Sequence, residues 1–403
     1  MSEIYKPRLR HFETKGTQQH VGEEDQYLYN QHAPTHRFAI IGVGTIGKEH
    51  MRVTTLLGRA RIHGIYDPQE RSLDVAETEF AKISSDKLVR YTDLDAACSD
   101  PDVDAYFICT PNYTHYEVLC TVIKTGKPIF VEKPMATTVD HAAKMVKMVN
   151  EYSSFIQIGL QYRYKRQYVE AYHEALVRKS LGDIKTISMS EFRPPFLDKV
   201  GQWNKFSEYS GGTLVEKSCH YFDLINLMAQ SEPKRVFASG GQAVTFKDFE
   251  KDGRASDIDD HAYAIIEYVN GIRANFTLNM FCPEFEEEMI VVGDKGRLIA
   301  REKFYYHRQQ PSKGSIEIEL GEEGPSKISE VTYPNLIEES GHHGATFYEH
   351  QAFVDQFEGK DVDCATAEQG LWAVIVACAA QESITTGQPI LIEEFLAKHG
   401  VSV

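Results

Sequence analysis

Short apolar runs and amphipathic segments alternate along the first 160 residues of the chain. The apolar runs have the length of buried strands, and the segments between them repeat apolar positions at helical spacing. Strands are expected at residues 38–41, 62–66, 88–91, 104–109, 129–131 and 155–158, and helices at 46–57, 70–82, from about 114, and at 139–152. This alternation predicts a doubly wound parallel sheet, whose ligands bind at the carboxyl ends of the strands.

The pattern changes after about residue 160, where alternation with a period of two becomes common. One helix is expected at 168–179, strands at 184–192, 235–244, 261–269, 272–280, 289–292 and 316–319, and closing helices at 346–357 and 367–386. Such alternation predicts a mainly antiparallel sheet. We therefore predict an α/β protein with an extension (1–36), a doubly wound domain (37–158) and a C-terminal α/β domain (159–403).

Composition narrows the class of protein. A chain of 403 residues exceeds the usual size of one domain. The net charge of −16 argues against nonspecific binding to nucleic acid, and no apolar run approaches the length of a membrane span. The seven cysteines are scattered without C-x-x-C spacing, and the N-terminus lacks a signal-peptide core. We expect a cytoplasmic protein with reduced thiols, no membrane partner and no metal site.

A glycine motif follows the first expected strand. Gly42, Gly44 and Gly47 form G-x-G-x-x-G, with Thr45 and Ile46 at the start of the next helix. Gly42 allows a tight turn, Gly44 lets the backbone approach a diphosphate, and Gly47 lets the helix pack on the strand. The free N–H groups of the first helical turn then face the anion. The motif predicts a dinucleotide site.

The second expected strand ends in Asp67, about 20 residues after the last glycine, as the dinucleotide fingerprint requires. Its carboxylate would accept hydrogen bonds from the adenosine ribose and would repel a 2′-phosphate. Asp67 therefore favours NAD over NADP, although Arg71 lies close by in the sequence.

Three further segments complete a family pattern. Cys109–His115 reads CTPNYTH, Val131–Pro134 reads VEKP, and Glu216–Asp223 reads EKSCHYFD. Together with the glycine motif, they resemble the glucose-fructose oxidoreductase / inositol dehydrogenase / MocA (Gfo/Idh/MocA) family over about residues 37–395. The resemblance implies an N-terminal Rossmann domain that binds NAD and a C-terminal α/β domain with an open sheet, for substrate binding and oligomerisation.

The resemblance also implies catalytic roles. It assigns Lys133 to the substrate hydroxyl, where an ammonium group would tune proton transfer, and it implies a cis Lys133–Pro134 bond. Glu216 and His220 are four residues apart, so they share one face if this stretch is helical. An imidazole beside a carboxylate is suited to proton transfer near neutral pH. The family usually has Asp where this chain has Glu216, and a small residue where it has Lys217. The alternative for His220 is a hydrogen-bonded core histidine.

The same resemblance places four further residues at the cofactor, and Lys133 is expected to contact it as well. Thr110, Asn112 and His115 would line its ribose and nicotinamide side, and Glu132 would meet a ribose. Asn112 could instead cap the helix that follows.

Basic residues flank the motifs of the second domain despite the acidic composition. Arg163, Arg193, Lys199 and Lys217 suggest an anionic sugar, because buried cations need compensation, and Trp203 and Asn204 could close over the ring. The alternative is solvated surface charge.

We predict an NAD-dependent oxidoreductase that removes a hydride from a secondary hydroxyl of a sugar, sugar acid or cyclitol. His220 would accept the proton of the substrate hydroxyl, and Glu216 would orient His220. Lys133 would hold the oxygen of that hydroxyl. Two alternatives stay open: an NAD-dependent glycoside hydrolase, and a noncatalytic nucleotide-sensing protein. The fold also favours a homo-oligomer.

Overall fold

The computed structural model describes residues 34–305 and 312–402, and these form parts of two compact units. Unit 1 comprises Met1–Met135, Met145–Gln161 and Pro334–Ala367, and unit 2 comprises the remaining segments, Ala136–Lys144, Tyr162–Tyr333 and Glu368–Val403. The predicted N-terminal extension lies almost wholly outside the described residues.

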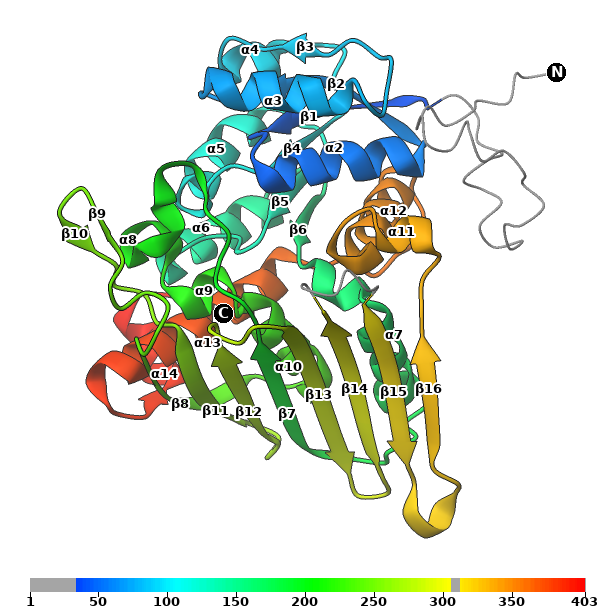
Figure 1. Cartoon of the computed structure of the whole chain (residues 1–403), viewed down its shortest axis with the longest axis vertical. Helices are drawn as coiled ribbons and strands as arrows, with labels where there is room; N and C mark the ends of the chain where they lie inside the picture. The colour runs from blue at the N-terminus through cyan, green and yellow to red at the C-terminus, as the bar shows by residue number, and fades with distance from the viewer. Residues whose placement is uncertain (1–33, 306–311, 403) are drawn as a thin grey trace. The chain divides into compact units, whose positions relative to one another are not determined.

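Unit 1 is built on a six-stranded parallel sheet (Figure 1). The strands are β1 (His36–Ile41), β2 (Ala60–Tyr66), β3 (Val89–Arg90), β4 (Ala105–Ile108), β5 (Ile129–Glu132) and β6 (Ile156–Gly159). Their order is β3-β2-β1-β4-β5-β6, so the winding reverses between β1 and β4. Strands β4, β5 and β6 are buried along their whole length, as expected of a parallel sheet covered on both faces. The prediction of a doubly wound parallel sheet is confirmed.

The helices that follow these strands begin close to the predicted positions. They are α2 (Thr45–Leu57), α3 (Glu70–Phe80), α5 (His115–Val122) and α6 (Val139–Asn150). A further helix, α4 (Leu94–Ser99), was not predicted because its six residues are too few to show a period. Its N-cap is Asp93, whose carboxylate accepts a hydrogen bond from the N–H of Ala96.

Unit 1 also includes α11 (Asn335–Glu338) and α12 (Ala345–Phe357), which the sequence analysis assigned to the second domain. Helix α12 packs against α2, and the ring of Phe353 meets those of Phe38 and Phe107. These contacts join segments some 300 residues apart, so no local pattern could have revealed them.

Unit 2 is built on a nine-stranded sheet in the order β16-β15-β14-β13-β7-β12-β11-β8-β17. The strands are β7 (Ile184–Phe192), β8 (Pro233–Gly241), β11 (His261–Tyr268), β12 (Arg273–Asn279), β13 (Phe285–Gly293), β14 (Arg297–Phe304), β15 (Lys313–Glu319), β16 (Lys327–Val331) and β17 (Ile390–Leu391). Neighbouring strands are antiparallel except β7 and β12, which confirms a mainly antiparallel sheet.

Helices cover one face of this sheet. The helices of unit 2 include α7 (Arg166–Tyr172), α8 (Ser207–Ser210), α9 (Thr213–Glu216), α10 (Cys219–Ala229), α13 (Ala367–Thr386) and α14 (Ile392–Lys398). In Figure 1, α7 and α10 lie behind the sheet, and no helix lies in front of β12 to β15. Side chains on the open face include Tyr263 and Ile265, both well exposed.

Strands β14, β16 and the two-residue β17 of this sheet escaped prediction, as did the short pair β9 (Glu250–Lys251) and β10 (Arg254–Ala255). The charged run Arg301-Glu302-Lys303 hid the alternation of β14. Arg301 and Lys303 lie on the open face, where they pair with Glu288 and Glu286 of β13, while Glu302 points to the buried face. Successive side chains of this run therefore still alternate between the two faces of the sheet. The alternation is hidden in the sequence because a charged residue, Glu302, takes the buried position that an apolar residue usually occupies.

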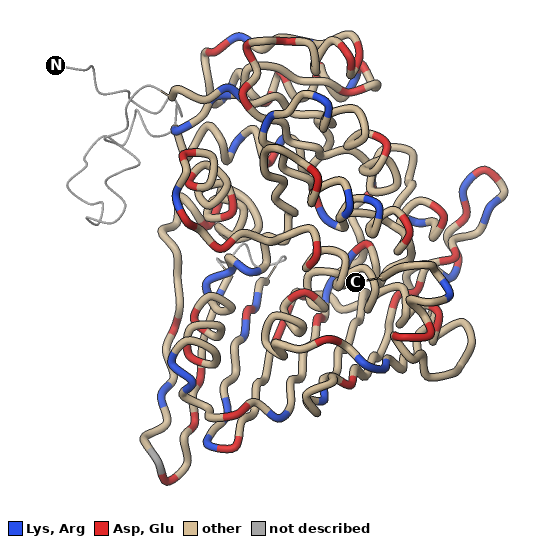
Figure 2. The backbone as a smooth tube through the Cα atoms, turned by 180° about the vertical axis from the view of Figure 1, so that it is seen from behind, with Lys and Arg blue, Asp and Glu red and all other residues tan. Residues whose placement is uncertain are grey.

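Acidic and basic residues are interspersed along the chain in Figure 2. All seven cysteines are free thiols. Within residues 34–305 and 312–402, no helix has the length and apolar content that a membrane crossing requires.

In the same part of the chain, His63, Asp100 and Asp102 bring possible metal-ligand atoms within 4.8 Å of one another. Because Tyr91 and Arg37 already hydrogen-bond these carboxylates, we assign no metal to the cluster.

Candidate functional site

The glycine turn has the shape that a dinucleotide diphosphate needs. Gly42 has a φ of 91°, and a Cβ there would lie 2.7 Å from the backbone of Cys109. A Cβ at Gly47 would overlap the carbonyl oxygen of Gly42, so helix and strand pack in direct contact. A Cβ at Gly44 would meet no atom within 4 Å, which leaves open space in front of the first turn of α2. Exposed Thr45 and half-buried Ile46 begin that turn. These residues fit the diphosphate of NAD.

Asp67 supports the turn from the end of β2. Its carboxylate accepts hydrogen bonds from the N–H of Val43 at 3.0 Å and of Gln69 at 2.9 Å, one on each oxygen. Each oxygen has a second lone pair, so the group can still accept from ribose hydroxyls. Arg71 is exposed on α3.

Asp67→Ala is expected to reduce the preference for NAD over NADP by weakening NAD binding, because the substitution removes both the ribose acceptor and the charge that repels a 2′-phosphate. Titration of each cofactor, followed by protein fluorescence, measures the two Kd values. Equal or tighter binding of NADP by the unaltered protein would refute the assignment.

Lys133 is the first residue after β5, at the carboxyl edge of the parallel sheet, and the Lys133–Pro134 peptide is cis. His115 is fully buried at the start of α5, with its ring nitrogens 2.9 Å from the carbonyl oxygens of Pro134 and Thr110. It thereby ties the end of β5 to the segment after β4. The Thr110 hydroxyl accepts from Thr114, and Asn112 is buried in the intervening turn. These contacts give His115 a supporting role beside its predicted place at the cofactor.

Glu132 belongs to a buried chain of polar groups. One carboxylate oxygen lies 2.8 Å from Nε2 of His50, and the other accepts the N–H of Lys133 at 2.9 Å. His50 Nδ1 lies 2.6 Å from His350 on α12, which in turn contacts Thr54. Burial opposes ionisation of Glu132, yet the hydrogen bond from His50 holds the pKa of Glu132 below its ordinary value. Both Glu132 oxygens thus have protein partners. This row of buried polar groups fixes the backbone that carries Lys133.

His220 lies in the first turn of α10 in unit 2. The preceding helix α9 ends at Glu216, and Lys217 and Ser218 separate the two helices. Glu216 and His220 therefore do not share one continuous helix, and the expectation of a common helical face was wrong. Gly211 and Gly212, at φ values of 78° and 91°, provide the turn that leads into α9.

The ring of His220 stacks on that of Tyr162, with centroids 3.9 Å apart and planes 8° from parallel. Lys217 donates a hydrogen bond to the Tyr162 hydroxyl at 2.7 Å, and Nζ of Lys165 lies 4.1 Å from the centre of the ring. Burial raises the pKa of Tyr162 well above its usual range, so the phenol stays protonated. Tyr162 was missed because nothing local distinguishes a stacked tyrosine from any other core aromatic.

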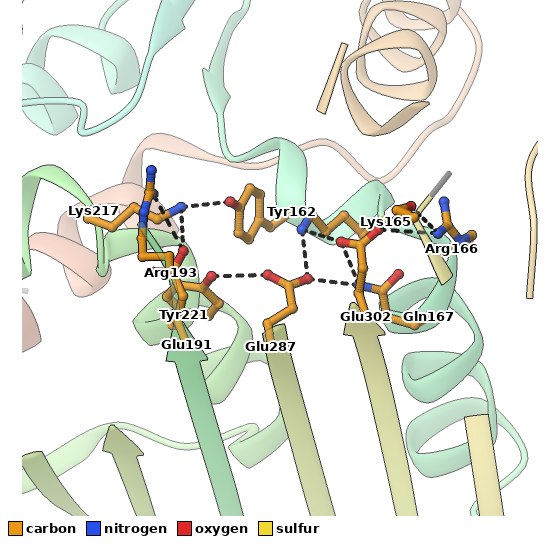
Figure 3. A network of polar contacts seen from close by, with 11 residues as sticks. Tyr162, Lys165, Arg166, Gln167, Glu191, Arg193, Lys217, Tyr221, Glu287 and Glu302 are labelled. Atoms are coloured by element: carbon orange, nitrogen blue, oxygen red, sulfur yellow. Dashed lines mark hydrogen bonds and ion pairs between the residues drawn. The ribbon is translucent and has the colours of Figure 1, made fainter. Parts of the chain in front are cut away.

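Carboxylates of the protein compensate the predicted basic residues. Lys217 and Arg193 lie 3.1 and 3.5 Å from the same oxygen of buried Glu191, as Figure 3 shows. Arg163 makes a two-pronged contact with Asp223 and a further hydrogen bond to Gln369. The inference that a substrate anion must balance these cations is therefore not required by their surroundings.

Lys199, Trp203 and Asn204 belong to one irregular segment before α8. Lys199 Nζ lies 3.9 Å from Glu216 and 5.3 Å from the centre of the Trp203 ring. Asn204 is fully buried and donates to the carbonyl of Leu197, which gives it a structural role in the loop.

Unit 2 also contains a pocket of about 600 Å³ that Arg163 and Asp223 line together with the end of α10 and the first turns of α13. Trp372, Gln369 and Asn226 contribute its aromatic and amide walls.

Three glutamates stand side by side on the buried face of the sheet. Glu191, Glu287 and Glu302 occupy paired positions of β7, β13 and β14. Lys165 bridges the second and third, at 2.6 Å from Glu287 and 2.7 Å from Glu302 (Figure 3). Arg166 adds a contact to Glu302, and Gln167 and Tyr221 hydrogen-bond Glu287. The sequence did contain a signal for this network. Each of the three strands has a glutamate at a position where the alternation places a side chain on the buried face of the sheet.

Two family models match the chain. One describes an oxidoreductase family with an NAD-binding Rossmann fold and matches residues 36–160, and the other describes its C-terminal alpha/beta domain and matches residues 173–392. The chain belongs to the Gfo/Idh/MocA oxidoreductase family. It is accordingly an NAD-binding oxidoreductase, as the glycine turn and Asp67 predicted.

Relatives cover most of the chain. Myo-inositol 2-dehydrogenase of Thermotoga maritima is 23% identical over 365 residues, which are 89% of this chain and 99% of the relative. Scyllo-inositol dehydrogenase from Lactobacillus casei, solved with NAD(H) and scyllo-inositol, has a TM-score of 0.69 at 22% identity and covers 89% of this chain and 99% of its own. Levoglucosan dehydrogenase with NADH and levoglucosan has a TM-score of 0.72 at 17% identity, with the same coverage. These structures share the fold.

Proposed function

We propose that this oxidoreductase is an NAD-dependent dehydrogenase of sugars or cyclitols that oxidises a secondary hydroxyl group. The observation that carries the proposal is the place of Lys133. It follows β5 at the carboxyl edge of the sheet whose β1 leads into the glycine turn, which is where sheets of this kind bind their ligands. Relatives named for inositol and levoglucosan support the substrate class.

In this proposal the ammonium group of Lys133 hydrogen-bonds the hydroxyl that becomes a carbonyl. His220 accepts the proton of that hydroxyl. NAD, when bound at the glycine turn, would supply the hydride acceptor. Tyr162 stacks on the imidazole and limits its rotation. Glu216 acts as a positioning residue near Lys199. The buried contacts of Glu132 hold the backbone of Lys133 in place, so that the ammonium group needs little reorganisation during the reaction.

The test is incubation with NAD and a panel of free cyclitols, neutral sugars, their uronic acids and aryl glycosides. We expect NADH to form with a free polyol and no aglycone to be released. Release of aglycone without net NADH would replace the proposal with an NAD-dependent glycoside hydrolase. Binding of NAD without turnover of any compound would favour a sensing protein.

The sequence-based hypothesis of an anionic sugar is tested in the same panel. Because Glu191 and Asp223 already pair with the nearby cations, a charged substrate is not needed for compensation. We expect each uronic acid to differ from its neutral parent by less than about tenfold in kcat/KM at fixed ionic strength, which corresponds to less than about 1.4 kcal/mol. A larger advantage for the acids would restore the anionic hypothesis.

We also retain homo-oligomerisation through the open face of the nine-stranded sheet as a proposal. Ile265 and Phe237 are directly opposite each other on β11 and β8, and both are exposed. Exposed apolar side chains that gather on one sheet face are typical of subunit contacts. Light scattering on the purified protein measures its mass, and a monomer at micromolar concentration would contradict the proposal.

A further inference from the structure

The loop between α11 and α12 is strained. His342 and His343 both have positive φ values, 41° and 54°, and Gly344 follows at 91°. Residues with a Cβ avoid this region, so two of them in succession are energetically unfavourable. Strain of this kind persists only where surrounding contacts hold it, and such residues are often found at ligand sites.

Contacts with α2 hold the loop in unit 1. Nδ1 of His342 lies 2.6 Å from Glu49, and the Thr346 hydroxyl donates to the same carboxylate oxygen. Arg52 donates to the carbonyl of Ser340 at 2.6 Å, and a Cβ on Gly341 would overlap the Glu49 side chain. The pKa of Glu49 is lowered to about 2, because the charge and hydrogen bonds of its partners outweigh the effect of burial.

The helices α2 and α12 run parallel and in register. Thr346 contacts Glu49, and His350 contacts Thr54, at sequence separations of 297 and 296 residues. The ion pair of Asp355 with Arg59 continues the series just beyond α2. A constant separation means that both helices advance in the same direction at the same rise. The loop before α12 follows the same side of α2. Ser340 lies beside Arg52, Gly341 and His342 lie beside Glu49, and Thr346 returns to Glu49, so His343 lies between two contacts with a residue one turn after Thr45.

The first turn of α2 is the part of the fold that receives the diphosphate of the dinucleotide. The strained loop is anchored to the same helix by Glu49 and Arg52, one and two turns after the residues that receive the diphosphate. Within the loop, His342 contacts Glu49, and the half-buried His343 follows it, next to Gly344.

We propose that His343 is a further NAD-binding residue, whose imidazole donates a hydrogen bond to the diphosphate of the cofactor. An imidazole N–H is a good donor to phosphate oxygens, and a charge-assisted bond of this type is stronger than a neutral one. The strain at His343 is then the cost of placing this donor at the end of the glycine turn. The proposal concerns the NAD site and does not depend on the identity of the substrate.

The test is NAD binding, measured by calorimetry on the full chain without substrate. His343→Ala is expected to raise the Kd for NAD at least about tenfold, the equivalent of about 1.4 kcal/mol. His399→Ala, which alters an exposed histidine of unit 2, is the matched control and should leave the Kd unchanged. ADP-ribose, which contains the diphosphate, should show the same loss in His343→Ala, whereas AMP, which lacks it, should not. An unchanged Kd for NAD, or an equal loss for AMP, would overturn the proposal.

A second variant separates binding from folding. Glycine tolerates a φ of 54° without strain, so His343→Gly should keep or raise the melting temperature of the NAD-free protein. The same variant should weaken NAD binding as much as His343→Ala does. A histidine retained only for structure would predict the opposite pair of results, a lower melting temperature and unchanged NAD affinity. Failure of the dehydrogenase proposal would leave both binding experiments interpretable, since neither requires turnover.

Discussion

Replacing Lys133 or His220 with alanine is expected to lower turnover by about 10²–10⁴-fold, the range typical for loss of a positioned proton-transfer group. Lys133→Ala removes the ammonium group that would hold the reacting oxygen, and His220→Ala removes the base. Neither change touches the glycine turn or Asp67, so the Kd for NAD should rise by only a small factor. Initial rates of NADH formation and an NAD titration for each variant measure the two quantities.

The controls for this prediction are Lys124→Ala and His173→Ala, since both residues are exposed and lie in the same units as Lys133 and His220 respectively. They should retain near-normal turnover. Lys133→Arg keeps the charge but changes its shape, so it should restore only part of the rate. Near-normal turnover in Lys133→Ala or His220→Ala would remove that residue from its proposed role, and loss of NAD binding would show that the variant acts on the cofactor site.

The Rossmann part of the fold could be predicted from sequence because its determinants are local. A short strand, a glycine turn and a helix specify one another within about 20 positions, and Asp67 follows at the expected distance. The structure agrees with the predicted roles of two of these glycines. Gly42 has a positive φ, as the tight turn requires, and Gly47 packs directly on the turn. Local rules of this kind are most reliable where turn chemistry and periodicity agree.

Long-range pairings could not be predicted in the same way. Helix α12 was correctly expected as a helix, but its place against α2 depends on His350 meeting His50 across 300 residues. Strand β14 was missed because its inward Glu302 is stabilised by Lys165, which is distant in sequence. Each of these partners is unremarkable by itself, and only the fold brings them together.

The predicted site shows the same contrast between local motifs, which the sequence reveals, and long-range contacts, which it does not. The residues of the motifs were identified individually, but the spacing of Glu216 and His220 misled because Lys217 and Ser218 interrupt the helix. The basic residues around the motifs suggested an anionic ligand because their carboxylate partners, Glu191 among them, carry no sequence mark that links them. Net charge near a motif is therefore a weak guide to substrate charge when the counter-charges lie on neighbouring strands.

Lys165→Met is expected to destabilise the protein by about 3–5 kcal/mol, the usual cost of removing one partner from a buried ion pair. Lys165 is almost fully buried and contacts both Glu287 and Glu302 at hydrogen-bond distance. Methionine has a similar volume but no charge, so the variant would leave two adjacent carboxylates buried without that ammonium group. Chemical denaturation, followed by a probe in unit 2, measures the free energy of unfolding. The matched control is Lys185→Met, which breaks a highly exposed pair with Asp183 and should change that free energy by less than about 1 kcal/mol.

The pH dependence of this loss follows from the sign of the carboxylate shift. Burial raises the pKa of Glu287 above its ordinary value even beside Lys165, and without the lysine the pKa should rise further. A carboxyl group whose folded-state pKa exceeds its unfolded value destabilises the fold above that range and less below it. The deficit of Lys165→Met should therefore be largest at neutral pH and shrink as the pH falls through the raised pKa of Glu287. Adding Glu287→Gln to Lys165→Met should recover part of the loss at neutral pH, because it removes one of the two buried charges. A deficit that is independent of pH and not relieved by Glu287→Gln would mean that Lys165 stabilises the fold by packing and not by its charge.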